Sequence, residues 1–185
     1  YCRSLDIPTP DFYGIFNIDF GVTIDGEPLR NFRELQHVIT SIDGPFVVKP
    51  VAGEHGIDVI VFDRFDARSS ILTRANGERL KLDDLYSLLS DREETWLLQS
   101  RVRQHPELTA LNQSSTNTVR IITLRDVDAE FKILGAILRI GIGKSEIDNT
   151  HAGGLVAPKD LETGTCAAGV LEHSIETYSH HPDSG

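Results

Sequence analysis

Two kinds of spacing between apolar residues divide this chain into helices and strands. One group of apolar positions recurs at helical spacing and consists of Leu29, Phe32, Leu35, Val38 and Ile39. That spacing gathers the apolar side chains on one side of a helix, so it predicts an amphipathic helix over residues 31–40. A second helical pattern follows Asp83, which we expect to cap a helix that runs to Leu89.

The other pattern is the short run of β-branched and aromatic residues that is typical of strands. Such runs occupy residues 46–48, 59–62, 96–99, 119–124 and 131–140. Several of them follow one another through short turns, as antiparallel hairpins do. The sequence therefore predicts an α+β fold with antiparallel sheets, divided near residue 100 into two halves.

Composition restricts the classes of protein and partner. The 185 residues are 39% hydrophobic and 25% charged, as in globular proteins. No run approaches the roughly 18 apolar residues of a membrane helix. The net charge of −10 argues against a nucleic-acid partner, because a phosphate backbone would be repelled. Cys2 and Cys166 are too few and too far apart for a disulfide framework or a zinc site. We expect a cytoplasmic protein without nucleic-acid or membrane partners.

The two ends of the sequence predict a fragment of a longer chain. There is no methionine, and the sequence opens on Tyr1 within what already resembles folded sequence. It ends shortly after His180 and His181, without a terminal helix. Adjacent histidines are possible metal ligands, but no acidic or histidine partner stands at helical spacing from them. We therefore expect His180 and His181 to be an exposed pair.

Lys49 ends a predicted strand and precedes a loop that contains Gly53 and Gly56. Glycines let backbone N–H groups wrap around an anion, and a lysine adds a mobile positive charge. The stretch therefore predicts a hairpin that closes over nucleotide phosphates. An ordinary hairpin with an exposed lysine has the same pattern, so both interpretations remain open.

A second candidate is the loop over residues 147–154, which combines a carboxylate, an amide, an imidazole and two adjacent glycines. This density of polar groups is typical of a loop that faces a ligand, although a solvated turn shares it. Arg120 lies inside an apolar run and Arg139 near the end of another, where a charge needs a partner or a site. A cross-strand salt bridge would account for either arginine.

Taken together, these motifs resemble the ATP-grasp superfamily, and most of all its sugar-transfer-associated group. The segments that carry the resemblance are Val48–Pro50 with Gly53 and Gly56, Leu98–Val102, His105–Leu108, Asn117–Leu124, Leu138–Gly141, Asp148–Gly154 and Ala157–Gly164. They extend over residues 31–185. The combination is specific, although no single segment is.

The resemblance implies an ATP-grasp-like α+β fold in which two subdomains hold ATP between them. Residues 31–100 would form the first subdomain with the phosphate-covering hairpin, and residues 101–185 a partial second one. Residues 1–30 would be a leading segment or the remnant of an upstream domain. An incomplete second subdomain leaves sheet edges uncovered, so we expect self-association through those edges.

The resemblance also assigns residues to the nucleotide. The implied nucleotide-binding residues are Lys49, Gly53, His55, Gly56, Gln99, Ser100, Arg101, Val102, Gly153 and Gly154. Lys49 would meet the phosphates and the adenine, and the loop over residues 53–56 would close over the phosphates. Residues 99–102 would form the hinge strand that contacts adenine, mainly through backbone groups.

Catalytic roles fall on Arg120, Asn149 and His151, which would face the γ-phosphate and the acceptor substrate. The family reaction uses ATP and Mg²⁺ to join a carboxylate to an amine or similar nucleophile through an acyl phosphate. Phosphorylation makes the carboxylate electrophilic, and cations stabilise the charge on the transferring group. The family takes its Mg²⁺ ligands from an Asp and a Glu-x-Asn pair on late strands. No such pair stands in the final residues, so the metal ligands are unknown.

The leading hypothesis is thus an ATP-dependent ligase of the ATP-grasp type, or a fragment of one, in sugar or polysaccharide metabolism with an unidentified small-molecule acceptor. A phosphotransferase would use the same phosphate-binding groups but leave a phosphorylated acceptor. A nucleotide-binding module without turnover is the third hypothesis, favoured by the missing metal-binding strands. The fourth is an α+β interaction domain, in which Lys49→Ala and Arg120→Ala would change no ligand affinity.

Overall fold

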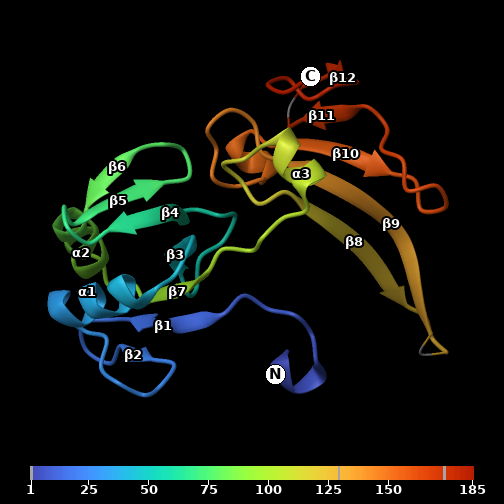
Figure 1. The fold of residues 1–185 in the computed structure, drawn as a ribbon. Helices are drawn as coiled ribbons and strands as arrows, with labels where there is room; N and C mark the ends of the chain where they lie inside the picture. The colour runs from blue at the N-terminus through green and yellow to red at the C-terminus, as the bar shows by residue number, and fades with distance from the viewer. Residues whose placement is uncertain (1, 129, 173) are drawn as a thin grey trace. The chain divides into compact units, whose positions relative to one another are not determined.

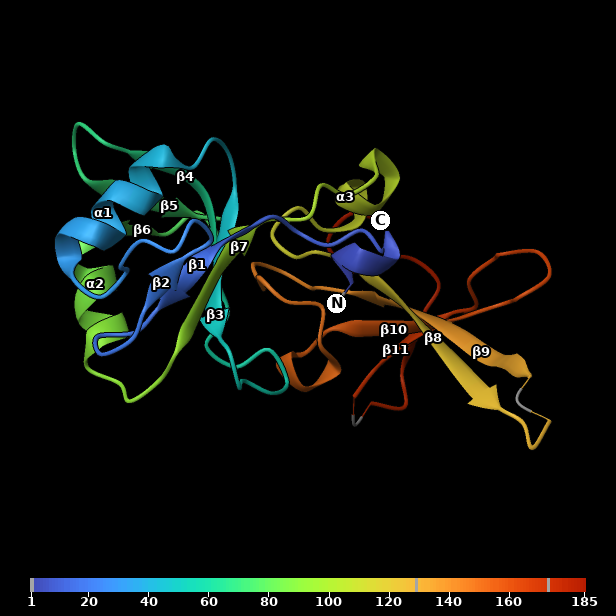
Figure 2. The same ribbon diagram turned by 90° about the horizontal axis from the view of Figure 1, so that it is seen from below.

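The computed structural model of the protein describes residues 2–128, 130–172 and 174–185, and the chain divides into two units, Tyr1–Arg103 and Gln104–Gly185. Each unit consists of an antiparallel sheet with few helices (Figures 1 and 2). The α+β class predicted from the sequence is therefore confirmed. Among the described residues, no helix has the length and apolarity that crossing a membrane requires.

The described residues of the first unit form a seven-stranded sheet in the order β2-β1-β7-β3-β4-β5-β6. Its strands are β1 (Phe12–Phe16), β2 (Val22–Thr23), β3 (Phe46–Pro50), β4 (Ile60–Asp66), β5 (Ile71–Arg74), β6 (Arg79–Lys81) and β7 (Trp96–Ser100). The helices α1 (Phe32–Ser41) and α2 (Leu82–Ser90) pack against one face of the sheet (Figure 2). A short 3-10 helix, η1 (Arg3–Leu5), precedes β1.

The helix α1 begins at Phe32, one residue after the predicted start, because a side-chain cap at Asn31 fixes its start. Asn31 Oδ1 accepts a hydrogen bond from the Glu34 N–H at 3.2 Å. The Glu34 carboxylate accepts one from the Arg30 N–H at 2.6 Å. The N–H groups of Arg30 and Glu34 at the start of the helix are thereby both hydrogen-bonded to nearby side chains.

The start of α2 differs from the sequence prediction. The helix begins at Leu82, and Lys81 before it makes no side-chain cap hydrogen bond. Asp83, expected as the cap, lies in the first helical turn, so that prediction is wrong. Its negative charge still stabilises the helix there, since the N-terminal end of a helix carries partial positive charge.

The core of the first unit lies between the two helices and the sheet. Phe46 and Phe62 are buried on the paired strands β3 and β4, and their rings stack with centroids 4.9 Å apart. Phe16 and Leu29 belong to the same core. Both come from residues 1–30, a segment that the sequence analysis set apart and that contributes β1 and β2 to this sheet.

The described residues of the second unit form a five-stranded sheet in the order β12-β11-β10-β9-β8. Its elements are β8 (Thr118–Arg125), β9 (Phe131–Ile140), β10 (Leu155–Lys159), β11 (Gly169–Leu171), β12 (Thr177–Tyr178), α3 (Pro106–Leu111) and the 3-10 helix η2 (Thr150–Ala152). Buried residues of β9 and β10 form a small core against which α3 packs. The helix α3 and the strands β11 and β12 were not predicted from the sequence.

The hairpin of β8 and β9 carries exposed apolar side chains on both of its faces. All eight residues of β8 are exposed, among them Ile121 and Leu124, which point to opposite faces. Phe131, at the start of β9, is 71% exposed. The other outer strands of the described sheets, β2, β6 and β12, have only two or three residues. Short outer strands resist edge-to-edge pairing, whereas β8 offers a long edge to another chain.

We expect the 185-residue chain to self-associate through the outer edge of β8. Replacing both Ile121 and Leu124 by lysine should weaken this association at least about tenfold, because two apolar side chains lose their burial and like charges meet across the pair. Sedimentation velocity over a range of concentrations measures the change.

Leu161→Lys is the matched control, because Leu161 is a similarly exposed apolar residue in the turn after β10. It should leave the association unchanged. A wild-type chain that stays monomeric at every concentration would contradict the prediction.

Candidate functional site

In the first unit, strand pairing places Lys49 and Gln99 on the same face of the sheet. The register pairs Val47 of β3 with Gln99 of β7, and Lys49 with Leu97. Side chains alternate between faces along a strand, and Val48 points into the core beneath the helices. Lys49 and Gln99 therefore lie on the opposite face, which we call the outer face of the first sheet.

The ammonium group of Lys49 is not neutralised by a neighbour. Within the part of the chain that the structure describes, no hydrogen bond or ion pair involves it. Arg101, just after β7, differs because its Nη1 lies 2.9 Å from Asp63 Oδ1 and its side chain is largely buried. Val102 follows and is exposed. Lys49 is thus available to an anionic ligand, whereas the Arg101 charge is already paired.

The loop between β3 and β4, residues 51–59, has an unusual backbone. His55, Gly56 and Asp58 all have positive φ, at 57°, 77° and 59°. Glycine adopts this conformation readily, but two residues with side chains do so only at a cost in free energy. Such turns direct neighbouring N–H groups to one side of the chain, as in concave backbone sites for anions.

The same loop is anchored at both ends. Asp58 Oδ2 lies 2.6 Å from Arg92 Nη1, and the Arg92 guanidinium lies 5.9 Å from the centre of the buried Trp96 ring. Near the other end, a side chain on Gly53 would place its Cβ 3.1 Å from the Pro50 Cβ. Glycine at this position lets the loop fold back closely against the end of β3.

The predicted hinge, residues 99–102, is held by hydrogen bonds within the first unit. The Ser100 N–H donates to the Asp11 carbonyl at 2.8 Å, and the Arg101 N–H donates to the Pro45 carbonyl at 3.0 Å. A nucleotide base that bonded to either N–H group would have to displace these partners. The structure therefore restricts the backbone contacts that the resemblance implied for this segment.

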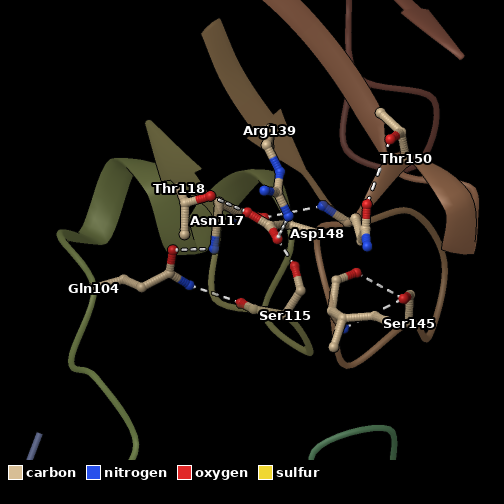
Figure 3. A network of polar contacts seen from close by, with 11 residues as sticks. Gln104, Ser115, Asn117, Thr118, Arg139, Ser145, Asp148 and Thr150 are labelled. Atoms are coloured by element: carbon tan, nitrogen blue, oxygen red, sulfur yellow. Dashed lines mark hydrogen bonds and ion pairs between the residues drawn. The ribbon is translucent and has the colours of Figure 1, made fainter. Parts of the chain in front are cut away.

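In the second unit, a buried carboxylate joins two strands and a loop. Asp148 is 7% exposed, and its Oδ1 accepts a hydrogen bond from Arg139 Nη2 at 2.6 Å. The Thr118 hydroxyl donates to Asp148 Oδ2. Thr118 and Arg139 are direct neighbours in the register of β8 and β9, and both reach Asp148 (Figure 3). Asp148 thus supplies the counter-charge that Arg139 needs. This counter-charge comes from a loop and not from the neighbouring strand.

A second set of polar contacts supports the start of this loop. Asn117 is 4% exposed; its Oδ1 accepts from the Gly141 N–H at 3.1 Å, and its Nδ2 donates to the Leu108 carbonyl at 2.7 Å. The Gln104 side chain accepts from the Asn117 N–H at 2.7 Å and donates to the Ser115 carbonyl at 2.8 Å (Figure 3). These contacts hold the chain at the point where β9 enters the loop.

The prediction of an exposed histidine pair is wrong for His181. His180 is exposed, but His181 is 5% exposed and its Nε2 lies 3.0 Å from the Gly141 carbonyl oxygen. His181 therefore binds the backbone at the start of the same loop. Its role is structural in this fold.

Arg120 lies on the same face of the second sheet as Arg139. The register pairs Thr118 with Arg139 and Arg120 with Ile137, so the two arginines are diagonal neighbours. Arg120 lies within the predicted apolar strand, but that strand is not buried, since all eight residues of β8 are exposed. In the described part of the chain, no ion pair neutralises Arg120. Among the described residues, this face of the second sheet therefore carries one guanidinium in an ion pair, that of Arg139, and one without an ion pair, that of Arg120.

The loop from Asn149 to Gly154 is closed by its own backbone. The Asn149 carbonyl accepts from the N–H groups of Ala152 at 3.0 Å and Gly154 at 2.9 Å. Gly153 has a φ of 85°. A Cβ on Gly154 would lie 2.5 Å from the Asp148 carbonyl oxygen, so only glycine fits there. Backbone packing thus links the predicted loop residues to the buried Asp148.

His151, in this loop, pairs with a residue that the sequence analysis did not select. Its Nδ1 lies 2.9 Å from Glu172 Oε2. Side-chain contacts thus join Thr118, Arg139 and Asp148, and Asn149, His151 and the two glycines follow Asp148 in the same loop. The polar density of residues 147–154 pointed to Asp148, whereas no sequence signal pointed to Glu172.

The described residues include no preformed cluster of metal-binding side chains. No cluster of three or more histidine, cysteine, aspartate or glutamate side chains stands close enough to hold a metal ion in that part of the chain. Asp148, the buried carboxylate of the loop, is already committed to Arg139 and Thr118. We therefore assign no residue as a metal ligand.

Comparison with known proteins gives one match. A family model described as sugar-transfer associated ATP-grasp matches residues 1–185. Searches of curated proteins and of solved structures returned no match.

The first prediction from this geometry concerns the buried ion pair. Asp148→Asn should lower the free energy of unfolding of the second unit by about 3 kcal/mol, because it leaves the largely buried Arg139 charge without its counter-charge. Amide hydrogen exchange measures this unit separately from the first. Asp126→Asn, which breaks the exposed pair with Lys132, is the matched control and should have a much smaller effect. Equal effects of the two substitutions would refute the structural role of Asp148.

The second prediction concerns the close approach at Gly154. Gly154→Ala should destabilise the second unit by about 1–3 kcal/mol and increase exchange across residues 141–154, because the added Cβ collides with backbone. Gly135→Ala in β9 is the control: its Cβ would meet nothing within 4 Å, so it should be neutral or slightly stabilising. Unchanged exchange in the Gly154 variant would show that the loop adopts another conformation.

Proposed function

The chain belongs to the sugar-transfer-associated ATP-grasp family, and we propose that it binds ATP and serves an ATP-dependent ligase of sugar or polysaccharide metabolism. The reaction is the joining of a carboxylate to an amine or a similar nucleophile through an acyl phosphate. The acceptor is a small molecule.

The observation that carries the proposal is the unneutralised Lys49 beside a strained glycine loop. The protein has 28 aspartates and glutamates against 18 lysines and arginines, so acidic partners for an ion pair are in excess. Within the described residues Lys49 makes no such pair, and the adjoining loop holds His55 and Asp58 in left-handed conformations. A triphosphate would supply the missing counter-charge and would repay the strain through bonds to backbone N–H groups.

The chemistry of the first step needs cations near the transferring group. A carboxylate oxygen attacks the γ-phosphorus, the bond to the β-phosphate oxygen breaks, and ADP leaves with the electron pair. In this proposal Lys49 binds the phosphates and Arg120 stabilises charge on the transferring group. Arg139 is not available for that role, because Asp148 holds it.

In the second step the nucleophile attacks the carbonyl carbon and inorganic phosphate leaves. Asn149 and His151 act on the acceptor side, and Gly153 and Gly154 allow the loop its close turn. Magnesium enters as the counter-ion of ATP. Because the described residues offer no cluster that fits it, no step of the reaction is assigned to the metal.

Calorimetric titration with Mg-ATP tests the proposal. We expect wild-type protein to bind and Lys49→Ala to lose about tenfold or more in affinity, since a charge-assisted phosphate contact contributes about 1.5–3 kcal/mol. Lys81→Ala is the matched control, because Lys81 is an exposed lysine of the same unit that makes no side-chain cap. Equal affinities of wild type and Lys49→Ala, or no binding at all, would overturn the nucleotide site.

Product analysis then separates the possible reactions. A ligase yields ADP, inorganic phosphate and an amide or ester, and hydroxylamine would trap its acyl phosphate as a hydroxamate. A phosphotransferase yields ADP and a phosphorylated acceptor. A binding module leaves ATP unchanged.

A further inference from the structure

We propose that Glu172 is a positioning residue for His151, and that His151 accepts the proton from the nucleophile in the second step. This inference rests on the proposed ligase function and adds a base to it. It concerns the second unit only, where both side chains lie.

The sheet itself brings the two residues together. β10 pairs with β11, and Leu155 at the start of β10 is opposite Leu171 at the end of β11. His151 precedes Leu155 by one tight turn, and Glu172 directly follows Leu171. Residues that are 21 positions apart in sequence therefore meet at one end of a strand pair. Any change of register between β10 and β11 would separate them.

The contact differs from the other histidine–carboxylate pairs among the described residues. His55 lies 3.8 Å from Glu54, and His105 lies 3.7 Å from Glu107. Both involve near neighbours in sequence and carboxylates that are more than four-fifths exposed. The His151–Glu172 distance is 2.9 Å, and the Glu172 side chain is only 25% exposed. Of the three, this pair alone lies within hydrogen-bond distance and joins residues that are far apart in the sequence.

The contact determines which nitrogen of the ring carries the proton. A carboxylate accepts and does not donate, so Nδ1 must be the protonated nitrogen of the neutral ring. Nε2 then carries the lone pair that a general base needs. The His151 side chain is 56% exposed, so a substrate can reach it. The arrangement is that of a base whose orientation and tautomer are set by a second residue.

The proton and electron balance of the step follows directly. The nucleophile forms a bond to the carbonyl carbon, and its N–H or O–H proton moves to His151 Nε2. The bond between the carbonyl carbon and the phosphate oxygen breaks, and inorganic phosphate leaves with the electron pair. The Glu172 carboxylate lies 2.9 Å from the ring, so the positive charge that the ring gains has a counter-charge beside it.

The test reads the tautomer directly and needs neither ATP nor acceptor. In protein labelled with ¹⁵N-histidine, two-bond proton–nitrogen correlation spectra distinguish a ring protonated on Nδ1 from one protonated on Nε2. His151→Gln identifies the signals of His151 among those of the seven histidines. We expect the Nδ1-protonated form in the wild type and its loss in Glu172→Ala.

Two further variants separate a specific contact from a general structural effect. Glu172→Gln keeps an oxygen acceptor without the charge, so it should keep the tautomer. Glu107→Ala, at the longer pair with His105, should leave the tautomers of both His105 and His151 unchanged. A wild-type His151 protonated on Nε2, or a tautomer that Glu172→Ala does not change, would overturn the inference.

Titration of the same samples with Mg-ATP distinguishes failure of this inference from failure of the proposed function. Nucleotide binding together with the wrong tautomer would reject the Glu172 role and leave the ligase proposal standing. The expected tautomer without nucleotide binding would reject the ligase proposal, and with it the catalytic role of His151.

Discussion

The alternation of side chains along paired strands is the constraint on which both groups of candidate residues depend. In the first unit, Val48 points beneath the helices, so Lys49 must lie on the other face. In the second, Leu138 belongs to the core against which α3 packs, so Arg139 must lie on the face that carries Arg120. Lys49, Arg120 and Arg139 thus lie on the faces opposite these apolar cores. The alternation that builds the apolar cores therefore also fixes the faces on which these candidate residues lie.

Within that constraint, Asp148 decides what the second unit can do with its two arginines. Both lie on one face as diagonal neighbours, yet only Arg139 is paired, with a carboxylate that is itself buried and also accepts from Thr118. A buried ion pair of this kind is costly to break, so Arg139 is fixed as part of the scaffold. Within the described residues, no ion pair neutralises Arg120. Two arginines that look equivalent in sequence thus have different roles because of one loop residue.

The limits of sequence-based prediction follow from the range of the contacts involved. Local patterns predicted α1 as well as the hairpin of β3 and β4, because apolar spacing acts over a few residues. The helix α3 and the strands β11 and β12 were missed, since they are too short to show a period. The burial of His181 and the partner of His151 depend on contacts across 40 and 21 residues. No local pattern encodes such contacts.

The strained loop between β3 and β4 bears on the choice between a phosphate-covering hairpin and an ordinary one. Holding His55 and Asp58 in left-handed conformations costs about 1–3 kcal/mol each. An ordinary hairpin of the same length has no need of this, because glycine or asparagine at those positions would remove most of the strain. Asp58 is secured through Arg92 to the buried Trp96, so the core maintains the conformation. Strain maintained by the core, next to an unpaired lysine, favours a loop shaped for a ligand.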